Sequence, residues 1–128
     1  MTTIKKFWSI EDNMKNNNKL KTIIQFLNEK KLSSLKVLDI RNISIIADYF
    51  IIISVPTQRN VEVLENDICD IMSKNNFQYR NKEGVHSKWV LIDFNDIIIH
   101  LFDDEYKDFY NLDKLWADAK EISVDDIL

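Results

Sequence analysis

The sequence predicts a single α+β domain in which helices flank a β-sheet. Three observations support this fold class: two segments with the apolar spacing of an amphipathic helix, several short β-branched runs, and two such runs separated by only two residues. The chain has 128 residues, of which 45% are hydrophobic, so it can bury a core without disulfides or metals.

Two helices are expected in the first half of the chain. The first spans residues 18–31, and the second begins after the N-cap Thr57 and ends near Asn75. Their buried stripes are Leu20, Ile23, Ile24 and Leu27 in the first helix, and Val61, Leu64, Ile68 and Met72 in the second. Arg59 falls in the first turn of the second helix, where the helix dipole disfavours a cation, so we expect it to have an acidic or carbonyl partner.

The strands are expected to be short. Two buried strands are predicted at 35–40 and 48–54, and a short edge strand is predicted at 77–80. Near the C-terminus, the acidic run at 103–105 suits the start of a helix. The aromatic residues that follow it predict a broken helix that packs back on the sheet.

The most informative stretch is a predicted β-hairpin. Residues 88–94 and 97–102 flank the pair Asn95-Asp96, which readily takes the left-handed backbone conformation of a two-residue turn. This turn fixes the register of the two strands and places Trp89 opposite Phe102. If the hairpin loop has four residues, the same side chains still share each face of the hairpin. If it has three, the side chains of one strand move to the opposite face.

The register divides the hairpin into two faces. The apolar face consists of Val90, Ile92, Phe94, Ile97, Ile99 and Leu101, and we expect it to be core. The mixed face consists of Trp89, Leu91, Asp93, Ile98, His100 and Phe102. Because an aspartate and a histidine argue against complete burial, the mixed face is either packed by a helix or available to a partner.

Composition excludes several classes of function. Gly84 is the only glycine, whereas the standard phosphate-binding loops need several. With Cys69 as its only cysteine and two histidines, the chain lacks the ligands of the common zinc sites, and a reduced, cytoplasmic setting fits best. We interpret Cys69, beside the second helix stripe, as inert packing. No apolar stretch approaches the roughly 20 residues of a membrane span, so no membrane partner is expected.

Charge is distributed unevenly along the chain. Residues 1–92 carry 14 basic and 10 acidic groups, whereas residues 93–128 carry 3 and 11, and the net charge is −4. An acidic C-terminal third disfavours direct nucleic-acid binding and favours a basic protein as partner. The alternative interpretation is a solvated acidic tail.

Each candidate site residue has a structural alternative. Asp93 and Asp96 could form a catalytic pair, but they flank a turn with their side chains divided between strand and loop, which favours a turn-stabilising role for Asp96. His100 has only Asp93 nearby as a second metal ligand, so we favour a hydrogen-bonded structural or interface histidine. Trp89 and Phe102 are either core residues or interface anchors of the kind that dominate binding hot spots.

Three segments together carry a specific resemblance: VLDIRNISIIADYFIII, WVLIDFNDIIIHLF and DEYKDFYNLDKLW. From about Lys30 to Trp116, the chain resembles the Iojap family, the ribosomal silencing factors called RsfS. The positions that match the characteristic residues of the family are Asp48, Arg59, Trp89, Asp93, Asp96, His100, Phe102, Tyr110 and Trp116. Two departures are Ser54-Val55-Pro56-Thr57, where the family commonly has Thr-Gly-Thr-Ser, and Lys107 in place of a usual arginine.

The resemblance implies a nucleotidyltransferase-like α+β fold with a mixed sheet and without established catalysis. It also implies binding to ribosomal protein L-fourteen of the large subunit, which sterically blocks joining of the small subunit and represses translation when nutrients are scarce. The first departure makes a residual nucleotide-binding loop less plausible, and the second weakens a bidentate contact because lysine is a point charge. We expect residues 1–17 to be a mobile N-terminal extension and residues 18–128 to form the silencing-factor domain.

We therefore predict a non-enzymatic binding module without cofactors. The expected partner-binding residues are Trp89, Leu91, Asp93, His100, Phe102, Tyr106, Tyr110 and Trp116, and the expected structural residues are Asp48, Arg59 and Asp96. One alternative is a degenerate nucleotidyltransferase-type enzyme or nucleotide-binding protein. Another is a homodimer that pairs through the mixed face when the protein is free.

Overall fold

The structure is a computed structural model that describes residues 17–106 and 117–128. Its elements in chain order are α3 (Asn18–Asn28), β1 (Ser34–Asp39), β2 (Tyr49–Val55), α4 (Gln58–Lys74), β3 (Asn81–Glu83), β4 (Trp89–Asp93), β5 (Ile97–Asp103), β6 (Lys120–Ile122) and α6 (Val124–Ile127). The described strands form one sheet in the order β3-β4-β5-β2-β1-β6. The β2–β5 pair is parallel and the other pairs are antiparallel, so the predicted α+β fold with a mixed sheet is confirmed.

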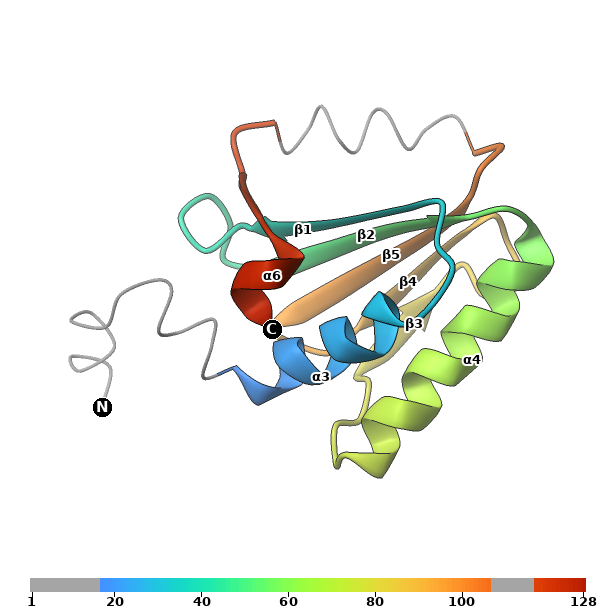
Figure 1. The fold of residues 1–128 in the computed structure, drawn as a ribbon, viewed down its shortest axis with the longest axis horizontal. Coiled ribbons are helices and arrows are strands. Elements are labelled where there is room, and N and C mark those ends of the chain that lie inside the picture. The colour runs from blue at the N-terminus through green and yellow to red at the C-terminus, as the bar shows by residue number, and fades with distance from the viewer. Residues whose placement is uncertain (1–16, 107–116) are drawn as a thin grey trace.

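The described helices α3, α4 and α6 all lie on one face of the sheet (Figure 1). Leu20, Ile68 and Ile127, one from each helix, belong to the same buried cluster. The apolar face of the hairpin contributes all six of its residues to this cluster, so its assignment to the core is confirmed. Both predicted helix stripes are buried in it as well.

The two long helices begin at residues whose side chains cap them. The Asn17 side chain accepts a hydrogen bond from the Leu20 N–H, and the Thr57 hydroxyl accepts one from the Asn60 N–H at 3.1 Å, as predicted for this N-cap. Helix α4 ends one residue before the predicted Asn75. Helix α3 ends at Asn28 instead of residue 31, because the next two N–H groups bond three residues back and close the helix.

The hairpin has the predicted register. Trp89 lies opposite Phe102, and the Phe94 N–H donates to the Ile97 carbonyl at 2.9 Å to close the turn. Of the two turn residues, only Asn95 takes a positive φ, of 82°. Asparagine tolerates this conformation better than most residues, so the left-handed position of the turn falls on its first residue alone.

The predicted edge strand at 77–80 is wrong, and the edge strand β3 begins at Asn81 instead. The Phe77 N–H donates to the Met72 carbonyl at 2.8 Å, and its ring packs against the core. Asn76 has a positive φ of 66°, which turns the chain back at the end of α4. Phe77 therefore closes the helix end, and backbone pairing with β4 starts at the Arg80 N–H, which donates to the Asp93 carbonyl at 2.7 Å.

The C-terminal elements β6 and α6 were not predicted from the sequence. They are short, and each buries an isoleucine: Ile122 in β6 and Ile127 in α6. The broken helix expected after residue 105 lies largely outside the described residues, and so does the N-terminal extension except for Asn17. Among the described helices, none is long and apolar enough to cross a membrane.

Candidate functional site

The mixed face continues from the hairpin across the sheet. Its side chains join a second buried cluster made of Leu38, Ile40, Ala47, Phe50, Ile52, Ile98 and Phe102, with Trp89, Leu91, Tyr106 and Ala119 packed partly buried against it. The described helices lie on the opposite face of the sheet (Figure 1). The sheet thus separates a largely aliphatic core, which contains the rings of Tyr49 and Phe94, from a smaller cluster in which aromatic rings are a larger share.

Three aromatic rings meet at one end of β4 and β5. The Trp89 ring stacks on Phe102 with centroids 5.4 Å apart and an interplanar angle of 24°. Tyr106 contacts both rings, with centroids 5.8 Å from Trp89 and 5.2 Å from Phe102. Separations of this size are favourable for aromatic pairs, so each ring restricts the orientation of the others.

His100 orients the Trp89 ring through a hydrogen bond. The Trp89 Nε1–H donates to His100 Nδ1 at 3.1 Å. Because the indole N–H is only a donor, the neutral imidazole carries its proton on Nε2, and that buried atom has no hydrogen-bond partner among residues 17–106 and 117–128. Burial lowers the pKa of His100 to about 4, so the ring is neutral at pH 7.

The expectation that the mixed face would not be completely buried is wrong for two of its residues. Phe102 has no exposed surface and His100 is 3% exposed, because both lie on β5, an interior strand of the sheet, among other rings. Trp89, Leu91, Asp93 and Tyr106 are partly exposed. A partner could contact these four side chains directly. His100 and Phe102 are too buried for that and instead orient the Trp89 ring.

Asp93 and Asp96 do not form a paired-carboxylate site. Asp93 binds Arg80 through Oδ2 at 2.9 Å and accepts the Asn95 N–H through Oδ1 at 2.7 Å. Asp96 forms an ion pair with Lys19 at 2.6 Å, which ties α3 to the hairpin turn. Each carboxylate is occupied by its own cation, and within residues 17–106 and 117–128 no group of three His, Cys, Asp or Glu side chains could hold a metal.

The other predicted site residues are dispersed. Asp48 is exposed, and its backbone N–H donates to the Asp96 carbonyl at 2.7 Å, so it lies beside the hairpin turn. Arg59 is exposed at the start of α4 and forms no ion pair with any described residue, so the partner expected for it is not found in this part of the chain. Tyr110 and Trp116 lie outside the described residues.

Two buried ion pairs were not anticipated from the sequence. Asp39 is 7% exposed and binds Arg41 through a fork at 2.7 and 3.0 Å. Burial acts to raise the pKa of Asp39, but the hydrogen bonds and charge of Arg41 outweigh it and hold that pKa below its usual value. Glu65 binds Lys82 at 3.0 Å and joins α4 to β3. Burial raises the pKa of the nearby Cys69 thiol, which agrees with its interpretation as inert packing.

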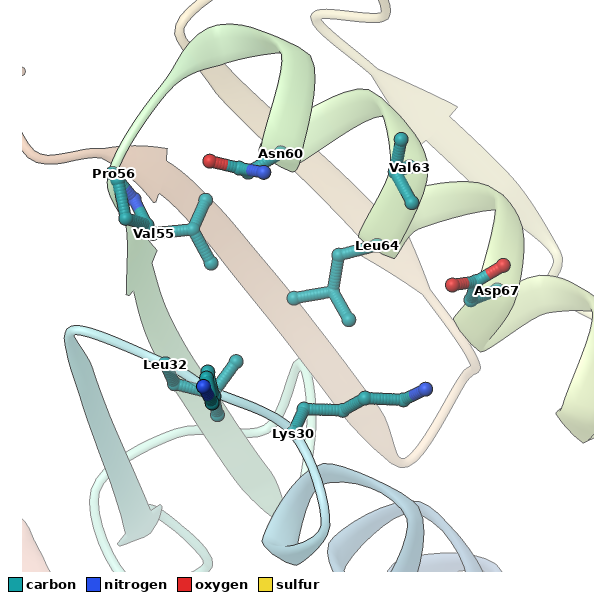
Figure 2. A pocket seen from close by; sticks show the side chains of 9 residues that line it. Lys30, Leu32, Val55, Pro56, Asn60, Val63, Leu64 and Asp67 are labelled. Carbon is teal, nitrogen blue, oxygen red and sulfur yellow. The ribbon is translucent and has the colours of Figure 1, made fainter.

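A pocket of about 370 Å³ lies where the chain after α3, the end of β2 and the first half of α4 meet (Figure 2). Leu32, Val55 and Leu64 point into it, and Lys30 and Asp67 stand at its rim. Its size suits a small molecule. Pro56 has no N–H and the Asn60 N–H is occupied by Thr57, so these two residues offer no backbone donor to a phosphate, and the cations in the lining are the side chains of Lys30 and Lys31.

Comparison with known protein families assigns the chain to one of them. The family model for "Ribosomal silencing factor during starvation" matches residues 13–128. The chain belongs to this family. The match begins at residue 13, inside the stretch that we expected to be an N-terminal extension. The name of the family describes a regulatory role in translation, not a reaction, and the resemblance found in the sequence is confirmed.

Individual RsfS proteins agree with this assignment. The ribosomal silencing factor RsfS of Bacillus subtilis is 33% identical over 107 residues, covering 83% of this chain and 91% of that protein. The chloroplastic protein Iojap of Zea mays is 25% identical over 96 residues, covering 75% of this chain and 42% of that protein. A crystal structure of a Bacillus halodurans protein is similar at a TM-score of 0.74 and 25% identity, over 84% of this chain and 99% of that chain.

Proposed function

We propose that this protein binds ribosomal protein L-fourteen on the large ribosomal subunit and blocks joining of the small subunit by its bulk. The observation that carries the proposal is the match of residues 13–128 to the ribosomal silencing factor family. The mechanism is occlusion, which requires a stable surface and no chemical step. It therefore agrees with a described structure in which Asp93 and Asp96 are each paired with a cation.

The exposed edge of the mixed face is suited to such binding. Trp89 offers a large ring whose orientation is fixed by the stack on Phe102 and the hydrogen bond to His100. A side chain that is already ordered loses little rotamer freedom when a partner binds it. Tyr106 and Leu91 lie beside it on the same cluster, and we place Tyr110 and Trp116 in the same interface as predicted.

Charge supports a basic protein as the partner. Residues 93–128 carry 11 acidic and 3 basic groups, which repel phosphate and attract basic surfaces. Such steering acts mainly on the association rate and is screened by salt. We therefore expect added salt to slow association with the large subunit more than it speeds dissociation.

The test is co-sedimentation of the purified protein with separated ribosomal subunits. We expect recovery with the large subunit only, and inhibition of subunit joining at the same protein concentrations. Trp89→Ala should weaken large-subunit binding by about 2 kcal/mol or more, the range of a hot spot. Val85→Ala, a change at an exposed side chain in the loop before β4, is the matched control and should bind normally.

Recovery with both subunits, or normal binding by a folded Trp89→Ala variant, would contradict the proposal. In the first case the contact is not on a large-subunit protein. In the second, Trp89 is structural and the docking surface lies elsewhere. The thermal midpoint of each variant, measured in parallel, separates lost binding from lost folding.

A further inference from the structure

The loop between β1 and β2 carries a concentration of exposed apolar side chains. In residues 41–48, here called the isoleucine loop, Ile43 is 45% exposed, Ile45 is 104% exposed and Ile46 is 58% exposed. Elsewhere in the described residues, the large apolar side chains that are exposed stand apart in the sequence: Val63, Tyr79, Val85 and Leu128. Single exposed apolar residues are ordinary, whereas a contiguous group indicates a contact surface.

The isoleucine loop is held in one conformation by its own hydrogen bonds. The N–H groups of Ile43 and Ser44 donate to the Ile40 carbonyl at 3.1 and 2.9 Å, and the Ile46 N–H donates to the Ser44 hydroxyl at 3.1 Å. Ile40, just before the loop, and Ala47, near its end, are buried in the cluster of the mixed face. The exposed isoleucines are therefore presented on an ordered support.

The base of the loop is fixed by a buried charge pair. Arg41 binds Asp39 through two of its nitrogens, and its guanidinium lies 5.2 Å from the centre of the Tyr49 ring. This arrangement orders the loop without helping to bury its isoleucines. Because ordering is already complete, an isoleucine that enters an apolar hollow on a partner gains most of its transfer free energy as affinity.

The charge around the loop indicates the kind of partner. Arg41 binds Asp39 and also interacts with the charge of Asp48, which is exposed at the end of the loop, so the two carboxylates outnumber this one cation. Lys120 lies opposite Asp39 in the β1–β6 register and is an exposed cation, and the exposed carboxylates of Asp118 and Glu121 flank it, so that with Asp48 the exposed carboxylates outnumber the exposed cation around the loop. An apolar tip bordered by carboxylates complements an apolar hollow that is bordered by basic groups.

A second copy of this chain fits the loop less well. Two copies would bring the same carboxylates together, and like charges in close contact disfavour association. A stable dimer buries about 800 Å² on each partner, more than three isoleucine side chains supply. The loop also stands at the opposite end of β4 and β5 from Trp89, beside the Asp96 turn, so it is separate from the exposed edge of the mixed face.

We propose that the isoleucine loop is a second docking element, which inserts Ile45 and Ile46 into an apolar hollow on a basic protein. This inference rests on the proposed function, so that protein belongs to the large ribosomal subunit. The loop and the edge of the mixed face then hold the partner at two separated points, which fixes the orientation of the bound factor as well as its affinity.

The first experiment compares two double variants of the full chain in binding to isolated large subunits. Ile45→Ser with Ile46→Ser should raise the Kd at least tenfold without lowering the thermal midpoint, because both side chains are exposed. The matched control, Val63→Ser with Val85→Ser, removes two exposed apolar side chains elsewhere and should bind normally. Normal binding by the loop variant overturns the inference while leaving the proposed function standing. If the unmodified protein fails to bind large subunits, the proposed function falls and the partner assigned to the loop falls with it.

The second experiment identifies what covers the loop. A benzophenone photocrosslinker in place of Ile45 should react with a basic protein of the large subunit, and the same probe at Val63 should not. Crosslinking to ribosomal RNA or to a second copy of the chain overturns the inference. So does binding to phosphatidylcholine vesicles that requires Ile45 and Ile46, since the loop would then be a membrane contact.

Discussion

Each face of the sheet carries a buried cluster, but the two clusters are built from different chemistry. On the apolar face, aliphatic side chains such as Ile92, Ile99 and Leu101 pack under the helices without any polar atom of their own. On the mixed face, Trp89 donates a hydrogen bond to His100 among aromatic rings, and the buried imidazole N–H finds no acceptor in the described part of the chain. The stability of the apolar face depends on close packing, whereas that of the mixed face also depends on directional contacts such as hydrogen bonds and ring stacking.

The difference shows which face carries requirements beyond folding. An unsatisfied buried N–H costs about 1–3 kcal/mol, and an aliphatic residue at position 100 would avoid that cost. The arrangement on the mixed face nevertheless fixes the exposed Trp89 ring from two directions. We infer that stability was gained on the apolar face and given up on the mixed face in order to orient Trp89.

The largest effect is expected on the apolar face. Ile99→Ala removes a side chain with no exposed surface from the middle of the sheet, and should cost about 2–5 kcal/mol of unfolding free energy through the cavity that it leaves. Urea denaturation at pH 7 measures this loss, with Val85→Ala as the exposed control. A loss below about 1 kcal/mol would mean that the apolar face is loosely packed and that the contrast between the faces is wrong.

A smaller effect should appear on the mixed face as a pH dependence. His100 takes up a proton near pH 6.5 in the unfolded chain but only near pH 4 when folded. The unfolded state therefore binds more protons between these values, and stability is complete above pH 6.5 and is lost as the pH falls toward 4. Between pH 7 and pH 5 we expect a loss of about 2 kcal/mol.

Urea denaturation of a His100→Gln variant at both pH values isolates this effect. The drop between pH 7 and pH 5 should largely disappear in that variant, because glutamine does not titrate. His86→Gln, a change at the exposed histidine before β4, should keep the drop. An equal drop in all three proteins would assign it to other groups and leave the neutral His100 without support.

The smallest effect is expected at the solvent-exposed rim of the mixed face. Arg80 binds Asp93 and the Asn95 side chain, but its own side chain is 60% exposed. Exposed ion pairs contribute little because water and salt screen them, so Arg80→Ala should change stability by less than about 1 kcal/mol. If the free energy of unfolding falls by more than about 2 kcal/mol in thermal or urea denaturation, the Arg80 contacts are essential to the stability of the hairpin and this prediction is wrong.

Much of the fold could be predicted because local signals agreed with the tertiary structure. The hairpin register follows from Asn95 and from period-two alternation, and a strand with one aliphatic face has a single favourable pairing. Helix α4 was located by its Thr57 cap and its buried stripe. Strand β6 and helix α6 are too short to produce a periodic pattern, so they gave no comparable signal.

The candidate site was harder to predict, because its burial depends on neighbours that are distant in sequence. His100 looked polar and accessible within its own hairpin, but the parallel pairing of β5 with β2 places it next to the Phe50 ring at 4.8 Å. The exposure of Ile45 is the opposite case. When hydrophobic residues stand just before a buried strand, the sequence does not predict that a turn will expose them to solvent.

The parallel pairing of β2 with β5 also determines the order in which this chain can be assembled during synthesis. Strand β2 lies in the first half of the chain and β5 in the second, with Tyr49 opposite Ile97. A nascent chain that has released β1 and β2 therefore exposes an unpaired, isoleucine-rich strand edge until the β4–β5 hairpin emerges and docks as a unit. Long-range parallel pairings form late, and open strand edges are where other chains attach. The β2 edge is thus open to other chains from the moment it leaves the ribosome until β5 has followed it and docked.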